Sequence, residues 1–238
     1  MSIQSTVLNF FLKKFVKNTK PSPDGYSYQD MRDLMNDSFE MGEKNFIEKL
    51  IIKSTFANRR SSIKSTETIL DGIRTLKITR DDSQKEKCIL YFHGGGYIAG
   101  SPETHLNLLK EIYNNSKITI YAIDYSLSPE SKFPLALNEA VRSYTALRDL
   151  GYQANNIIIG GDSAGGNLSL VCTLKLQEDN QELPSKLFLL SPWTDLTASG
   201  ESIEQNSISD PYLSYDDFHL TKKSMKKVAE TWYATGYN

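Results

Sequence analysis

The sequence predicts an α/β fold in which a mostly parallel β-sheet is flanked by helices. From about residue 68 onward, short apolar runs alternate with helical patterns of roughly ten to fifteen residues, which is typical of repeated strand–helix–strand units. Before this region lie about sixty residues of helical character and the polar stretch ANRRSSIKSTE, which marks a boundary. The chain of 238 residues is long enough to bury a sizeable core.

The individual elements follow from the apolar pattern in chain order. Strands are expected at residues 73–78, 87–92, 117–124, 156–160 and 186–190, and helices at 103–115, 134–150 and 164–176. Pro134 suits the first turn of its helix, because the N–H that proline lacks has no partner there, and Gly151 suits the C-terminal cap. Helical patterns are also expected at 28–53 and 215–232.

The first residues form an amphipathic pattern of their own. Apolar side chains recur at helical spacing and lysines occupy other positions around the helix: Val7, Leu8, Phe11, Leu12 and Phe15, with Lys13, Lys14 and Lys17. Such a helix packs on its own domain or, as the alternative, touches a lipid surface. Asn9 and Lys13 interrupt the apolar run and no small-residue cleavage site follows, so a secretory signal is not expected.

The composition argues against several classes of partner. The 27 Lys and Arg residues nearly balance the 29 Asp and Glu residues, so no nucleic-acid partner is expected. No apolar run is long enough for a transmembrane segment. Cys88 and Cys172 stand in apolar surroundings, which predicts buried free thiols rather than a disulfide or a metal site. A cytoplasmic location fits these features best.

A serine in a glycine-rich turn is the first candidate for chemistry. The segment from Gly161 to Gly165 has the spacing G-x-S-x-G, and it lies between an expected strand and an expected helix. A serine at such a strained strand-to-helix turn exposes its hydroxyl as a nucleophile, and the small neighbours avoid clashes with the adjoining strand and helix. The alternative is that Ser163 only caps the helix.

A second glycine motif supplies the complementary chemistry. His93, Gly94, Gly95 and Gly96 directly follow the expected strand at 87–92. Backbone N–H groups of such a loop can stabilise the oxyanion of an acyl-transfer intermediate. A phosphate-binding loop is the alternative, but neither of its usual glycine spacings is present. His93 is expected to brace this loop rather than to act as a base.

Five motifs in fixed order carry a resemblance to a known family. HGGGY, DYSLSPE, the FP dipeptide at 133–134, GGDSAGGN and SPWTDL together resemble the hormone-sensitive-lipase-like branch of the α/β-hydrolases, over about residues 85–200. One departure is Ser126, where members of the family usually carry arginine. We expect this change to disturb local packing more than chemistry.

The resemblance implies a fold, a domain division and a set of site residues. It implies an α/β-hydrolase fold, with a helical cap segment at 1–60, the hydrolase core at 61–200 and a second cap segment at 201–238. Small acyl esters are the implied substrates, and no metal or organic cofactor is expected. The implied nucleophile is Ser163, the oxyanion donors are the N–H groups of Gly95, Gly96 and Ala164, and the supporting motif residues are His93, Gly94, Gly161, Asp162 and Gly165.

The rest of the catalytic triad is expected to be absent. In this fold the acid and then the histidine follow the serine along the chain, and the resemblance places them roughly a hundred residues or more beyond it. The chain ends at Asn238, so we expect a C-terminally truncated hydrolase that lacks its last strands and has poor or no activity. His219 is not expected to substitute, Asp195 and Asp210 match structural positions, and His105 is expected at the surface.

Three interpretations of function remain open at this stage. The first is a carboxylesterase whose activity needs a missing C-terminal piece. The second is a non-catalytic homologue that binds a small ligand. In the third, the unprotected apolar edge formed by residues 186–190 pairs with a second chain that supplies the base, since exposed edge strands readily pair with other chains.

Overall fold

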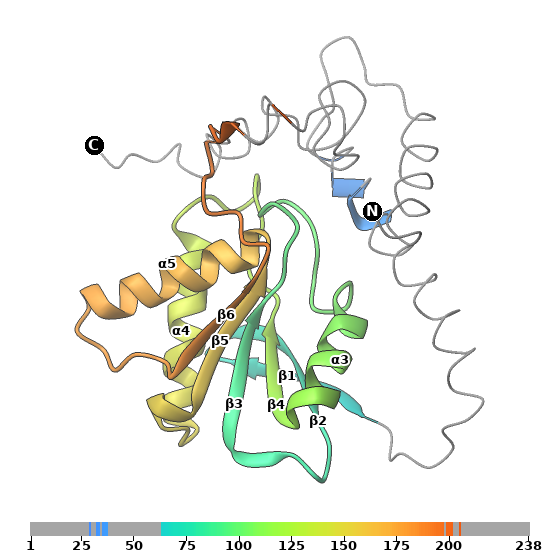
Figure 1. Cartoon of the computed structure of the whole chain (residues 1–238), viewed down its shortest axis with the longest axis vertical. Helices are drawn as coiled ribbons and strands as arrows, with labels where there is room; N and C mark the ends of the chain where they lie inside the picture. Colours follow the sequence, from blue (N-terminus) through green and yellow to red (C-terminus); the bar gives the residue numbers. More distant parts are fainter. Residues whose placement is uncertain are drawn as a thin grey trace.

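A mixed β-sheet organises the part of the chain that the structure describes. The computed structural model describes residues 63–197, 199–201 and 205, together with 29, 32, 33 and 35–37. Figure 1 shows the sheet between helices on its two faces, with strand order β1-β2-β4-β3-β5-β6. The strands are β1 (Lys64–Leu70), β2 (Ile73–Thr79), β3 (Gln84–Phe92), β4 (Ile118–Ile123), β5 (Ile157–Asp162) and β6 (Lys186–Leu190).

The strand pairing confirms the expected α/β class. The pairs β3–β4, β3–β5 and β5–β6 are parallel, whereas β1–β2 and β2–β4 are antiparallel. The helices are α3 (Leu106–Ser116), α4 (Leu135–Asp149) and α5 (Ala164–Glu178), with a short 3-10 helix η1 (Ala154–Asn156) before β5. Parallel strands need such crossover helices, and the helices cover the apolar faces of the sheet.

Two apolar cores lie on opposite faces of the sheet. Helices α4 and α5 pack over one face and α3 packs over the other (Figure 1). Cys88 and Cys172 lie in the larger core as buried free thiols, as predicted, and burial raises the pKa of both. The larger core contains Leu90, Phe92, Tyr144, Leu147, Ile159 and Leu168, and the smaller one contains Ile78, Ile89, Tyr91, Leu109, Tyr113 and Ile120.

One strand was missed by the sequence pattern. β1 occupies part of the polar stretch that was interpreted as a boundary, and most of its side chains are exposed. It pairs with β2, and the turn Asp71-Gly72 connects the two strands. Both turn residues have positive φ angles, 45° and 80°. An Asp-Gly pair between two strands is a strong hairpin signal, because both residues tolerate this backbone conformation. That signal was present, but the polar character of the outer strand obscured it.

The expected end of α4 is confirmed. Gly151 has φ 98°, and its N–H donates to the carbonyl of Arg148, while Tyr152 donates to Leu147. These bonds satisfy carbonyls that the last helical turn leaves without partners. Pro134 stands one position earlier than expected, as the residue that precedes the first helical residue.

Several predicted features lie outside the described residues. They are the amphipathic segment at residues 7–15, the helix at 215–232, Asp210 and His219. Of the segment 28–53, only residues 29, 32, 33 and 35–37 are described, and these are helical. Arg32 among them donates to the carbonyls of Ile98 (2.6 Å) and Ser128 (2.7 Å). Within the described part of the chain, no helix has the length and apolar character needed to cross a membrane.

Candidate active site

Ser163 occupies a strained turn between β5 and α5. Its backbone angles are φ 51° and ψ −117°, a conformation that L-residues other than glycine rarely adopt. Three hydrogen bonds hold it there. The N–H of Ser163 donates to the carbonyl of Leu190 at 3.0 Å, and its own carbonyl accepts from Asn167 at 3.1 Å and Trp193 at 2.9 Å. The surrounding structure therefore holds the serine in this conformation where β5 ends and α5 begins.

Close packing explains the glycines around this serine. A Cβ atom on Gly165 would lie 2.0 Å from the carbonyl oxygen of Phe92, and one on Gly161 would lie 2.5 Å from backbone atoms of Gly165 and Phe92. On Gly166 it would come within 2.8 Å of Pro192. The turn can therefore approach β3 and Pro192 only because these positions carry no side chain.

The glycine loop that follows β3 lies beside this turn. Residues Phe92 and Gly161 are partners in the parallel pair β3–β5, so both motifs leave the sheet at the same end. Gly95 and Gly96 have φ angles of 121° and 62°, in the region that favours glycine. Among the described residues, no hydrogen bond uses the N–H of either glycine. Ala164 begins α5, where N–H groups lack helical partners.

Asp162 connects the two motifs through its side chain. Its Oδ1 accepts hydrogen bonds from the Tyr91 hydroxyl at 2.7 Å and the Gly94 N–H at 2.9 Å, and its Oδ2 lies 3.3 Å from Nε2 of His105. Burial raises the pKa of this carboxyl. The hydrogen bond and charge of His105, together with hydrogen bonds from Tyr91 and Gly94, outweigh burial and lower the pKa. Asp162 is therefore an ionised acceptor between the loop and the turn.

His93 packs within the loop that it begins. Its ring stacks on Tyr125 with 4.2 Å between centroids, and its Nδ1 lies 2.7 Å from the carbonyl of Gly94. The hydroxyl of Tyr125 donates to the carbonyl of His93 at 2.6 Å. Burial, assisted by the nearby charge of His105, lowers the pKa of His93 to about 4. The ring is thus neutral at pH 7.

The expectation for His105 was wrong. Its side chain is buried, with Nε2 facing Asp162 and Nδ1 lying 3.1 Å from the carbonyl of Ser101. The residue precedes α3, and packing of that helix on the sheet turns the ring inward toward the loop. No local pattern reveals this burial, because the partner of His105 lies 57 positions further along the chain.

Two further contacts involve the other motifs. The hydroxyl of Tyr97 donates to Oδ1 of Asn167 at 2.6 Å, so HGGGY and GGDSAGGN are connected a second time. At the unusual position Ser126, the N–H and the hydroxyl donate to the Glu139 carboxylate at 2.7 and 2.8 Å. This position is thus anchored by hydrogen bonds to α4.

The described residues provide no base for the serine. The Ser163 hydroxyl makes no hydrogen bond within the described part of the chain, and His93 and His105 are engaged with the loop. Asp195 accepts hydrogen bonds from Thr197 and Ser199 in a local turn. A general base for Ser163 would therefore come from outside the described residues.

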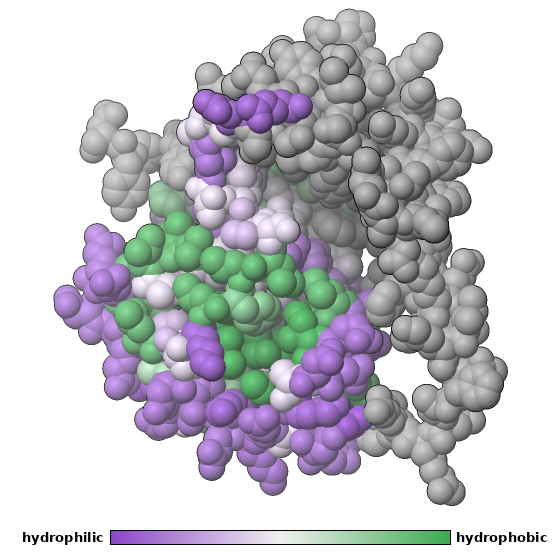
Figure 2. All heavy atoms as spheres, in the orientation of Figure 1, coloured by the Kyte–Doolittle hydropathy of each residue, from purple (hydrophilic) through white to green (hydrophobic). Residues whose placement is uncertain are grey.

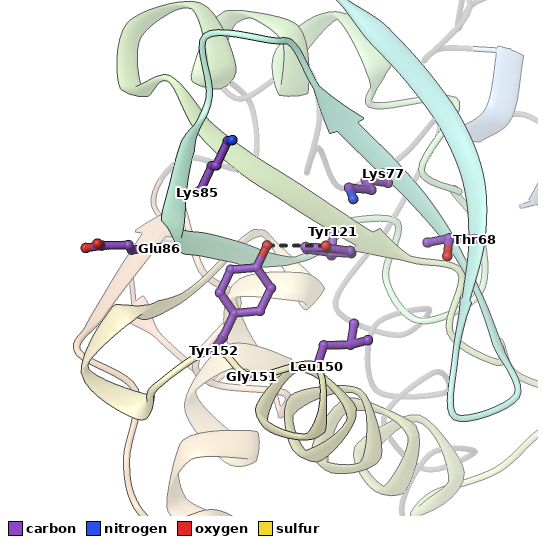
Figure 3. A pocket seen from close by; sticks show the side chains of 8 residues that line it. All are labelled: Thr68, Lys77, Lys85, Glu86, Tyr121, Leu150, Gly151 and Tyr152. Atoms are coloured by element: carbon purple, nitrogen blue, oxygen red, sulfur yellow. Dashed lines mark hydrogen bonds between the residues drawn. The ribbon is translucent and has the colours of Figure 1, made fainter.

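A separate hollow lies at the other end of the sheet (Figure 3). It has a volume of about 550 Å³ and lies where β3 begins and α4 ends. The hydroxyls of Tyr121 and Tyr152 meet there at 3.4 Å, and Nζ of Lys77 lies 5.4 Å from the centre of the Tyr121 ring. None of the candidate site residues lines it. Its lining consists of Thr68, Lys77, Lys85, Glu86, Tyr121, Leu150, Gly151 and Tyr152.

Comparison with known proteins identifies the class of protein that has this fold and these two glycine motifs. A family model described as alpha/beta hydrolase fold matches residues 89–236. A solved structure described as an esterase from the bacterial hormone-sensitive lipase family superposes with a TM-score of 0.79 at 25% identity, and covers 100% of this chain and 71% of that one. The chain therefore belongs to the α/β-hydrolases, in their hormone-sensitive-lipase-like branch.

Two sequence relatives agree with this assignment. An esterase of Acinetobacter venetianus is 35% identical over 147 residues, which covers 62% of this chain and 48% of the relative. A hormone-sensitive lipase of Mus musculus is 34% identical over 129 residues, which covers 52% of this chain and 17% of that lipase. The chain thus spans about half the length of the bacterial esterase and less of the mammalian lipase. The family predicted from the motifs is confirmed.

Proposed function

We propose that this chain carries the nucleophile and the oxyanion site of a carboxylesterase that acts on small acyl esters. The observation that carries the proposal is the strained backbone of Ser163, held between β5 and α5 beside the glycine loop. The similar proteins named esterase and hormone-sensitive lipase support this reaction class. The proposed reaction needs no metal or organic cofactor, and we place the protein in the cytoplasm.

In the proposed reaction, the Ser163 oxygen attacks the acyl carbon of the ester while a base takes its proton. The N–H groups of Gly95, Gly96 and Ala164 would then stabilise the negative oxygen of the tetrahedral intermediate. The bond to the alcohol oxygen breaks, the alcohol leaves with the proton, and an acyl-serine remains. Water then attacks the acyl carbon, which releases the acid and regenerates the serine.

We further propose that the described residues alone give slow turnover. Ser163 is in hydrogen-bond contact with no imidazole among them, and removal of the base from a serine triad costs about a million-fold in kcat. An acid and a histidine from outside the described residues would complete the site. We retain the division into a cap segment at 1–60, a core at 61–200 and a second cap segment at 201–238 as part of the proposal.

Labelling with a fluorophosphonate probe tests the proposed nucleophile. We expect slow covalent labelling of the full chain, located at Ser163 by peptide mass spectrometry and lost in Ser163→Ala. Rapid labelling would show that residues outside the described part of this chain supply the base, and would contradict the expectation that His219 does not substitute. If no label is incorporated and small ligands raise the melting temperature without ester turnover, the chain is a ligand-binding homologue and the proposed esterase function is wrong.

The free edge of the sheet supports a proposal about association. Among the described residues β6 pairs only with β5, and Leu190 at its end is 39% exposed. Figure 2 shows apolar residues spread across the face of the molecule over this part of the sheet and α5, where Leu174 is 62% exposed. An exposed apolar edge favours pairing with another strand. We propose that two copies of the chain associate along β6.

Sedimentation velocity tests this association. We expect a dimer for the unaltered chain and a monomer for Leu190→Lys, because a lysine at an edge strand must be desolvated if another strand pairs there. The substitution keeps the backbone carbonyl that accepts from Ser163. A monomeric unaltered chain, or an equally dimeric variant, would contradict the proposal.

A further inference from the structure

The peptide groups that lead into the glycine loop are held by side chains on both sides. In the peptide group between His93 and Gly94, the carbonyl accepts from the Tyr125 hydroxyl at 2.6 Å and the N–H donates to Asp162 at 2.9 Å. In the next peptide group, the Gly94 carbonyl lies 2.7 Å from Nδ1 of His93. Because a carbonyl oxygen only accepts, Nδ1 carries the proton of this ring.

These contacts determine the direction of a proposed oxyanion donor. A trans peptide group is planar, so its N–H points opposite to its carbonyl. The hydrogen bond from His93 to the Gly94 carbonyl therefore orients the N–H of Gly95. The Asp162 carboxylate restrains the same segment one peptide earlier, where a Cβ on Gly94 would lie only 2.1 Å from Oδ2. The carboxylate thus fills the space that a side chain at position 94 would need.

The partner of Asp162 is suited to hold this carboxylate ionised. Nε2 of His105 faces Oδ2 of Asp162 at 3.3 Å, and its Nδ1 faces the carbonyl of Ser101 at 3.1 Å. An ionised carboxylate can only accept, so Nε2 of His105 carries a proton and donates it to Asp162. Nδ1 also lies 2.9 Å from the Thr104 hydroxyl, so the ring is held on both sides. A hydrogen-bonded pair whose side chains are only 5% and 22% exposed therefore lies beside the nucleophile turn.

We propose that Asp162, paired with His105, is a positioning residue that holds the glycine loop so that the N–H groups of Gly95 and Gly96 face the ester oxygen. The proposal rests on the function proposed for Ser163. Asp162 is adjacent to the nucleophile in sequence and bonded to the loop in space, so one carboxylate sets the distance between the two halves of the site. Neither Asp162 nor His105 needs to touch the substrate.

Glycine-selective NMR of the full chain tests the positioning role without requiring turnover. Labelling with ¹⁵N-glycine gives at most 14 signals, one for each glycine of the chain. In Asp162→Asn the side chain keeps its shape but loses its charge. A hydrogen bond to a charged group has an equilibrium constant about tenfold larger than one to a neutral group. We expect hydrogen exchange of the Gly94 amide to accelerate about tenfold, with shifted Gly95 and Gly96 signals.

Two controls separate positioning from stability. The amide of Gly160 in β5 reports on the sheet, so it should keep its exchange rate in Asp162→Asn. Asp124→Asn removes another carboxylate at the same end of the sheet, one that pairs with Arg74 at 2.9 Å and has no bond to the loop. It should leave the loop signals unchanged. Equal acceleration at Gly94 and Gly160 would show a purely structural role and overturn the proposal.

The rate of fluorophosphonate labelling tests whether the positioning by Asp162 affects the chemistry at Ser163. We expect Asp162→Asn to slow labelling of Ser163 about tenfold, since a misdirected oxyanion donor costs at least that much. His105→Gln, which can still donate one hydrogen bond, should have a smaller effect in the same direction. Unchanged labelling in both variants would overturn the positioning role. If the unaltered chain is not labelled while the Gly94 signal responds as expected, the function proposed for Ser163 is wrong. The positioning role of Asp162 is then still supported.

Discussion

Replacement of Gly165 by alanine is expected to destabilise the fold by about 3 kcal/mol and to prevent labelling of Ser163. The added Cβ would lie 2.0 Å from the carbonyl oxygen of Phe92 and 2.6 Å from that of His93. Both are backbone atoms of β3 and the glycine loop, so no side chain can rotate away to make room. Either α5 moves off the sheet or the loop shifts, and both changes separate the serine turn from the oxyanion donors. Urea unfolding measures the loss of stability.

Gly151→Ala provides the matched control for this substitution. Gly151 also takes an unfavourable conformation for alanine, with φ 98°, but a Cβ there would meet no atom within 4 Å. The expected loss is about 1 kcal/mol, from backbone strain alone, with labelling of Ser163 unchanged. If the two variants lose equal stability, close packing is not the reason for glycine at position 165.

Acidification from pH 7 to pH 4 is expected to remove about 3 kcal/mol of folding free energy through His93. Burial lowers the pKa of this ring from 6.5 to about 4 in the folded protein. The unfolded chain therefore binds a proton between these two values and the folded protein does not. The stabilisation is complete above pH 6.5 and is lost as the pH falls toward the folded pKa. The contribution of Asp162, whose pKa is lowered, is lost only at more acidic pH.

Urea unfolding at several pH values between 7 and 4 measures this contribution. In His93→Gln the amide can still donate to the Gly94 carbonyl but cannot titrate. Its free energy of unfolding should therefore fall less steeply over this range than that of the unaltered chain. Equal slopes for the two proteins would show that His93 does not account for the acid sensitivity.

Most elements of the sheet could be predicted because they are buried on both faces. β4 is buried along its whole length and β5 begins with three isoleucines, and parallel strands covered by helices are expected to have this composition. β1 was missed for the opposite reason, since an outer strand with exposed polar side chains has no apolar periodicity. Only its Asp-Gly turn indicates it. The start of β3 at Gln84, three residues earlier than expected, likewise falls on exposed residues.

The candidate site could be predicted in part. Ser163 and the loop from His93 to Gly96 are recognisable, because the chemistry requires small residues at adjacent positions of the sequence. The contact between Asp162 and His105 could not be predicted, since no spacing rule relates residues in different crossover units. The expected surface position of His105 was wrong for the same reason, since its burial depends on that contact.

The sequence by itself determined the fold class, the family and the two glycine motifs. Each of these is a matter of local composition, such as an apolar run or a residue too small to block an approach. Only the tertiary structure decided which groups meet. The parallel pairing of β3 with β5 brings Gly94 against Asp162, and packing of α3 turns His105 toward the same carboxylate. Hydrogen bonds between distant segments depend on angles and distances that the sheet sets, and a linear pattern does not contain them.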